Sequence, residues 1–82
     1  PSEALERTEA LRLLDEALAR MNDEQREAFL LCELEGMTSR EVAEELGGNP
    51  NTIRTRLRAA RTVFSATVAR ANAKERWRLG DG

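Results

Sequence analysis

The sequence lacks histidine and tyrosine and has a single cysteine, Cys32, among its 82 residues. A lone cysteine excludes an internal disulfide, and without histidine or a second cysteine there is no ligand set for a structural zinc site. General acid–base catalysis would fall on carboxylates or on the few Cys, Ser and Lys side chains, none of which lies in a recognisable catalytic constellation. We therefore expect no enzyme, no metal, no cofactor and no small-molecule substrate.

Long apolar runs are also missing. No stretch approaches the ~18 apolar residues of a membrane span, and the N-terminus lacks the basic-then-apolar pattern of a signal peptide. A chain of this length buries only about 60% of the surface that its unfolded form exposes, enough for one modest core. We expect a single domain over residues 1–82 in a soluble, cytoplasmic protein that does not contact a membrane.

Charge is distributed unevenly along the chain. The formal net charge is −2, but residues 1–48 carry 13 acidic and 5 basic side chains, whereas residues 49–82 carry 2 acidic and 8 basic ones. Such asymmetry is typical of a local basic surface masked by an acidic remainder, although solvated helices can also differ in charge without a function. The net charge alone therefore does not exclude a nucleic-acid partner.

The local signals predict an all-α fold of four helices. Ala, Leu, Glu and Arg are abundant, and no stretch alternates like a strand. Capping boxes at Asn22 and Thr38, glycine stops at Gly36 and Gly47, and Asn49 followed by Pro50 place the boundaries. The expected helices are 3–21, 23–35, a short one of about eight residues after Thr38, and a long last helix from Pro50 to about Ala73, with residues 74–82 as a flexible or partner-packed tail.

Apolar positions at helical spacing predict which faces are buried. The expected core positions are Leu11, Leu14, Leu18 and Met21 in the first helix, Val42, Ala43 and Leu46 in the third, and Ile53, Leu57, Ala60 and Phe64 in the fourth.

The last two helices have the outline of a helix-turn-helix over residues 38–64, with the long last helix as the recognition helix. Its outward face, about 100–200° from Ile53 on a helical wheel, contains no acid. Arg can bond guanine, Asn can bond adenine, and Thr offers a hydroxyl and a methyl group. The outward face comprises Asn51, Arg54, Thr55, Arg58 and Thr62, with Arg61 at its edge.

Phosphate contacts are expected at the start of the third helix. Ser39, Arg40 and the free N–H groups there would lie where a DNA backbone crosses a helix-turn-helix. Arg56 points away from the reading face, so we expect it either to touch a flanking phosphate or to pair with an acid of the third helix.

The run Cys32–Gly47, followed by Thr52–Leu57 and Ala60–Arg61, resembles region 4 of bacterial sigma-70-family sigma factors, and most closely the extracytoplasmic-function group. The similarity covers roughly residues 14–64. It implies a domain that reads the promoter −35 element in double-stranded DNA, docks on the flap of the RNA polymerase β subunit and is often masked by an anti-sigma factor. By position, the resemblance implies base contacts from Asn51, Thr52, Arg54, Thr55 and Arg58, and phosphate contacts from Ser39, Arg40 and Arg61.

A second surface is suggested by the broad apolar distribution in residues 23–35. One interpretation is that this helix is central in a small bundle and is covered on most sides. The alternative is a partner surface formed by Leu31 or Leu34 together with Leu13. In the same way, the whole chain could serve as a protein-interaction module that binds an anti-sigma factor, polymerase or an activator instead of DNA. Salt-sensitive binding to a partner protein without duplex binding would favour that alternative.

Overall fold

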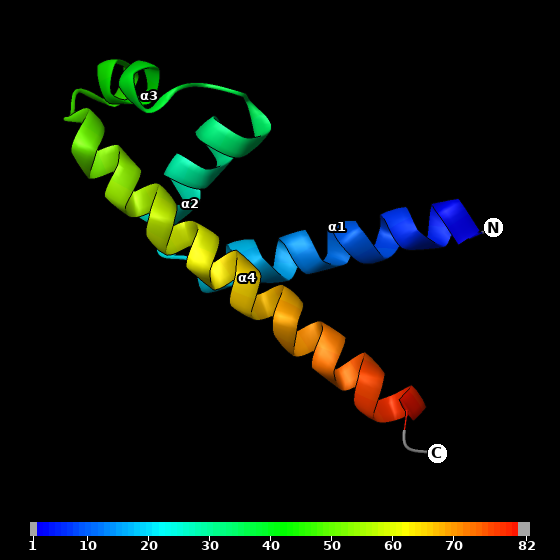
Figure 1. Ribbon diagram of the computed structural model, residues 1–82. Coiled ribbons are helices and arrows are strands. Elements are labelled where there is room, and N and C mark those ends of the chain that lie inside the picture. The colour runs from blue at the N-terminus through cyan, green and yellow to red at the C-terminus, as the bar shows by residue number, and fades with distance from the viewer. Residues whose placement is uncertain (1, 81–82) are drawn as a thin grey trace. The chain divides into compact units, whose positions relative to one another are not determined.

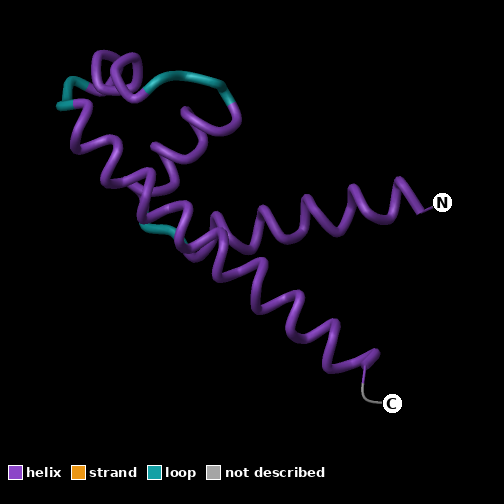
Figure 2. The backbone as a smooth tube through the Cα atoms, in the orientation of Figure 1, coloured by secondary structure: helices purple, strands orange, loops and turns teal. Residues whose placement is uncertain are grey.

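The computed structural model describes the backbone of residues 2–80 and the side chains of residues 6–77 (Figure 1). Its elements are α1 (Ser2–Arg20), α2 (Asp23–Phe29), a π-helical turn η1 (Leu30–Leu34), α3 (Ser39–Leu46) and α4 (Pro50–Gly80). Short loops join the helices, and the described residues contain no strand (Figure 2). The predicted all-α fold with four helices is confirmed.

The chain forms two compact units. One unit, Met21–Thr62, holds α2, η1, α3 and the first part of α4; the other combines Pro1–Arg20 with Val63–Gly82. α4 continues through Lys74 to Gly80, whereas the sequence predicted helix only to about Ala73. No glycine or proline interrupts residues 51–79, so the helix has no local stop signal there.

The predicted caps are present. Asn22 Oδ1 accepts the Gln25 N–H at 2.8 Å and Thr38 Oγ1 accepts the Glu41 N–H at 3.1 Å, and each capping box is closed by the reciprocal bond. Gly47 ends α3 in the left-handed region at φ 76°, a conformation that favours glycine because it has no Cβ. These local bonds fix where α2 and α3 begin and where α3 ends.

The segment expected as one helix over residues 23–35 is helical as far as Leu34, but its second half is π-helical. α2 ends at Phe29, and the chain continues as a π-helical turn in which the Glu35 N–H donates to the Leu30 carbonyl at 3.1 Å. A π turn spans one residue more than an α turn. The caps that bound the segment are compatible with either geometry, so they could not reveal the difference.

The core of the Met21–Thr62 unit is a cluster contributed by three helices. Ala28 of α2, Val42 and Ala43 of α3 and Ile53 of α4 are each no more than 2% exposed. Leu31, Cys32 and Met37 pack against them. The small Ala28 and Ala43 side chains occupy little of this cluster, and the larger Val42 and Ile53 side chains fill most of it.

Two expected core residues are exposed. Leu46 is 39% exposed because it is the last residue of α3, directly before the Gly47 stop. Leu11 is 56% exposed, whereas Ala17 in the same helix is fully buried. Six residues correspond to about 600° of rotation, so Leu11 and Ala17 point about 120° apart, and α1 packs through the alanine side.

Shortening the buried Ile53 by one methyl group should be costly. We expect Ile53→Val to lower the free energy of unfolding by about 0.5–1.5 kcal/mol, because Ile53 is buried and the lost methyl group would leave an enclosed cavity. Leu11→Ala removes more atoms, but from an exposed site, and should change the free energy of unfolding by less than about 0.5 kcal/mol. Urea unfolding followed by circular dichroism at 222 nm measures both, and a larger effect of Leu11→Ala would contradict the packing described.

Candidate nucleic-acid interface

The Met21–Thr62 unit contains a helix-turn-helix. α3 ends at Gly47, and α4 starts at Pro50 after a turn in which Asn49 Oδ1 accepts the Asn51 N–H at 2.8 Å. Burial of Val42, Ala43 and Ile53 joins the two helices through their inner faces. The outer face of α4 is thereby left to solvent.

That outer face carries the side chains predicted to read bases. Ile53, Leu57 and Ala60 are buried on the opposite side of the helix. All five residues predicted to contact bases are exposed, namely Asn51, Thr52, Arg54, Thr55 and Arg58. Thr62, one turn beyond Arg58, is exposed as well. No acidic residue occurs in α4 before Glu75, so the face presents donors without a carboxylate of its own helix.

Hydrogen bonds order several of these side chains. Arg54 Nη1 donates to Asn51 Oδ1 at 2.6 Å, and Thr55 Oγ1 donates to the Asn51 carbonyl at 3.0 Å. Thr62 Oγ1 donates to the Arg58 carbonyl at 3.1 Å. Because these hydroxyl protons are already bonded, each threonine offers its methyl group and an oxygen lone pair outward.

Two exposed arginines of the Met21–Thr62 unit have guanidinium groups with no internal partner among the described residues. Arg58 on α4 and Arg40 in the first turn of α3 are exposed, and within the described part of the chain neither guanidinium forms a hydrogen bond or ion pair. Ser39, the first residue of α3, is half-buried. Arg40 and Arg58 can therefore meet a ligand without first breaking an internal contact.

The other two arginines predicted to touch phosphate are paired. Arg56 Nη2 lies 3.0 Å from Glu24 Oε2 of α2, and Arg61 Nε donates to Glu33 Oε1 of η1 at 2.5 Å. The acid that meets Arg56 comes from α2 and not, as expected, from the third helix. Neither glutamate was predictable as a partner, because Glu33 lies 28 positions and Glu24 lies 32 positions before its arginine in the sequence, and no local spacing connects them. Phosphate contact by Arg56 or Arg61 stays a prediction, and it would compete with these pairs.

The three predicted partner-surface residues differ in burial and are divided between the two units, so a shared partner surface stays a prediction. Leu31 packs against the core cluster, whereas Leu34 is 56% exposed on η1. Leu13 is half-buried and belongs to the other unit. Leu34 and Leu46 are the large apolar side chains that are exposed among the described residues of the Met21–Thr62 unit, and Leu34 is the more exposed of the two.

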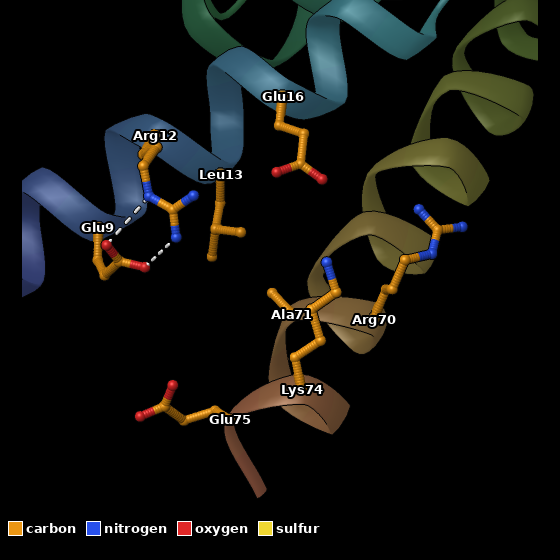
Figure 3. A pocket seen from close by; sticks show the side chains of 8 residues that line it. All are labelled: Glu9, Arg12, Leu13, Glu16, Arg70, Ala71, Lys74 and Glu75. Carbon is orange, nitrogen blue, oxygen red and sulfur yellow. Dashed lines mark hydrogen bonds and ion pairs between the residues drawn. The ribbon is translucent and has the colours of Figure 1, made fainter. Parts of the chain in front are cut away.

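Leu13 lines a cavity of about 180 Å³ between α1 and the C-terminal part of α4 (Figure 3). Its lining is mostly charged and balanced in sign, with Glu9 already bonded to Arg12. Small-molecule sites are usually lined by apolar side chains with a few polar groups, so this cavity lacks the character of a ligand pocket. Glu9, Arg12, Leu13, Glu16, Arg70, Ala71, Lys74 and Glu75 form its wall.

Cys32 lies beside the Arg61–Glu33 pair. Desolvation raises the pKa of its thiol above the usual value, the Glu33 carboxylate raises that pKa further, and the Arg61 guanidinium acts in the opposite direction. The thiolate is the reactive form, so a raised pKa makes this cysteine a poor nucleophile at neutral pH.

A helix-turn-helix whose outer helical face carries arginines and no acidic residue is characteristic of a nucleic-acid-binding domain. Residues 11–62 match the family described as Sigma-70, region 4, and the chain belongs to that family. The predicted region 4 of an extracytoplasmic-function sigma factor is confirmed.

One curated relative is the ferric citrate uptake sigma factor FecI of Escherichia coli (strain K12), with 41% identity over 54 residues. That alignment covers 66% of this chain and 31% of FecI, so the chain spans about a third of this relative. No solved structure matches the chain. Among the described helices, none is long and apolar enough to cross a membrane.

The pKa of Cys32 reports on the Arg61–Glu33 pair. Since the carboxylate raises this pKa, Glu33→Gln should lower it and shift the pH profile of Cys32 alkylation by iodoacetamide to lower pH; Arg61→Ala should shift the profile upward. The midpoint of the profile is the quantity measured, because it does not depend on how accessible the sulfur is. Glu35→Gln, which removes a neighbouring charge that does not influence the thiol, is the control, and an equal shift there would contradict the arrangement.

Proposed function

We propose that this chain recognises the promoter −35 element as region 4 of an extracytoplasmic-function sigma factor and so helps direct RNA polymerase to promoters. The observation that carries the proposal is the division of the four arginines in the first part of α4: Arg56 and Arg61 at its edges are paired with acids, whereas Arg54 and Arg58 on its outer face are exposed to solvent. Membership of the Sigma-70 region 4 family supports the same reading.

In this proposal, α4 enters the major groove with its N-terminal half. Arg54 and Arg58 each present a planar fork of donors, which suits the O6 and N7 acceptors of guanine. Thr55 presents its methyl group to a thymine, and Thr52 and Asn51 lie at the groove edge near the start of the helix. The polar contacts specify sequence, because only the base edges differ from site to site.

Phosphate contacts in this proposal fix the orientation of the domain. The Arg40 guanidinium and the backbone N–H groups of Ser39 and Arg40 meet one strand of the DNA backbone, with the Ser39 hydroxyl beside them. The partial positive charge at a helix N-terminus favours a phosphate there. These contacts contribute affinity with little dependence on sequence.

Protein partners belong to the proposal as well. The exposed Leu34 on η1 is the contact that we assign to the β-subunit flap of RNA polymerase or to an anti-sigma factor. The chain acts in the cytoplasm, where the promoter is, and carries out no catalysis of its own. If the chain binds such a protein but no duplex, it is an interaction module and the DNA-reading role is wrong.

Arg58→Ala tests the base contacts. A duplex is first selected from a random pool, and its affinity is measured by fluorescence anisotropy. Loss of a bidentate contact should weaken binding by about 1–3 kcal/mol, roughly 5-fold to 150-fold, and relax the preference at one base pair. Arg7→Ala, which removes the same charge from an exposed site on α1, should have a far smaller effect. Equal losses of affinity in Arg58→Ala and Arg7→Ala would show that Arg58 contributes only nonspecific charge attraction and contacts no base.

Arg40→Ala tests the phosphate contacts. The plot of log affinity against log salt should become shallower by about 0.9, the contribution of one neutralised phosphate. Specific and random duplexes should weaken alike, because a phosphate contact carries no sequence information. Anisotropy titrations at several salt concentrations measure the slope, and a loss confined to the selected duplex would show that Arg40 reads a base instead.

A further inference from the structure

Asn51 and Arg54 are joined on the outer face of α4. They are three residues apart, so their side chains lie on the same side of the helix. Arg54 Nη1 donates to Asn51 Oδ1 at 2.6 Å, and both residues are exposed. The hydrogen bond therefore stands on the surface that faces the proposed DNA site, not in the packed interior.

The backbone around Asn51 is itself fixed. Its N–H donates to the cap residue Asn49 at 2.8 Å, and its carbonyl accepts the Thr55 hydroxyl at 3.0 Å. With both backbone groups bonded in the first turn, the Asn51 side chain starts from a defined position. It can hold Arg54 at a lower entropic cost than a side chain on a mobile loop.

The chemistry of the two groups decides how they are oriented. A guanidinium can only donate, so the amide oxygen of Asn51, and not its nitrogen, must face Arg54. Reading adenine would require the same oxygen to accept from N6 while the amide nitrogen donates to N7. An asparagine already bonded to an arginine is poorly placed for that task.

The hydrogen bond to Asn51 leaves free the edge of the Arg54 guanidinium that could bind a base. Nε and Nη2 share an edge of the planar guanidinium that does not include Nη1, and this edge carries two parallel N–H donors. These match the O6 and N7 acceptors of guanine. Holding Nη1 thus fixes the plane of the guanidinium without using the donors that would read the base.

From this geometry we propose that Asn51 is a positioning residue for Arg54, and that the two side chains read one guanine as a unit. The proposal rests on the DNA-binding function proposed above. It replaces the expectation that Asn51 contacts an adenine directly. In this proposal Arg54 provides the preference for guanine at this base pair, and Asn51 strengthens that preference.

A double-mutant cycle on the purified chain tests the proposal. Asn51→Ala, Arg54→Ala and the double variant are compared by anisotropy on the selected duplex and on duplexes changed at single base pairs. Arg54→Ala should reduce the preference for one guanine by roughly tenfold or more. Asn51→Ala should reduce the preference at the same base pair by roughly threefold to tenfold, and adding it to Arg54→Ala should cost nothing further.

Asn51→Asp is the informative conservative variant. Aspartate places an acceptor where the amide oxygen was, so the guanine preference should survive even though the new charge lowers overall affinity. An aspartate cannot donate to adenine N7, so a direct adenine contact would be lost in this variant. Circular dichroism of each variant confirms that α4 is intact.

Several results would overturn the proposal. Additive losses in the double variant, or a changed preference at a different base pair in Asn51→Ala, would show that Asn51 reads DNA on its own. Equal loss of preference in Asn51→Ala and Asn51→Asp would do the same. Absence of duplex binding by the unaltered chain would overturn the DNA-binding function itself, whereas binding that depends on Arg58 together with an additive cycle would overturn the Asn51 role alone.

Discussion

The candidate nucleic-acid interface depends on the apolar cluster to which α2, α3 and α4 each contribute buried side chains. Ala28, Val42, Ala43 and Ile53 form this cluster, and Leu31 of η1 packs against it. Once Ile53 is buried, the helical period fixes the rotation of α4, and its polar residues must face outward. The recognition surface is therefore a consequence of which side chains are buried, since α4 has no other means of choosing its orientation.

Pairing with acids then divides the arginines of α4 by position. Arg56 and Arg61 flank the buried stripe on its two edges, where Glu24 and Glu33 of the neighbouring segments can reach them. Each exposed or half-exposed pair contributes little to stability, about 0–1 kcal/mol. Their larger effect is electrostatic, because they neutralise the sides of the helix and concentrate the uncompensated positive charge on the face with Arg54 and Arg58.

The sequence predicted well what depends on local chemistry and poorly what depends on distant neighbours. The caps at Asn22 and Thr38, the stop at Gly47 and the buried stripe of Ile53 were predictable, because each follows from spacing within one helix. The exposure of Leu11 and Leu46, the pairing of Glu33 with Arg61 and the bond from Arg54 to Asn51 were not. The exposure of Leu11 and the pairing of Glu33 with Arg61 depend on which segment lies nearby. The exposure of Leu46 depends on its place at the end of α3, and the bond from Arg54 to Asn51 on a choice among side-chain rotamers; a helical wheel represents neither.

The π-helical turn at Leu30–Leu34 matters for how chains of this kind can differ in length. The turn accommodates one residue more than an α-helix would between the same flanking positions, while α2 before it and the Thr38 cap after it keep their own local bonds. Loss of a single residue from this segment would convert it to ordinary α-helix. Elsewhere in α2 or α4 such a deletion would rotate all following side chains by about 100° and misalign the buried face. The π-helical turn is thus the position in this unit where the loss of one residue would disturb the buried faces least.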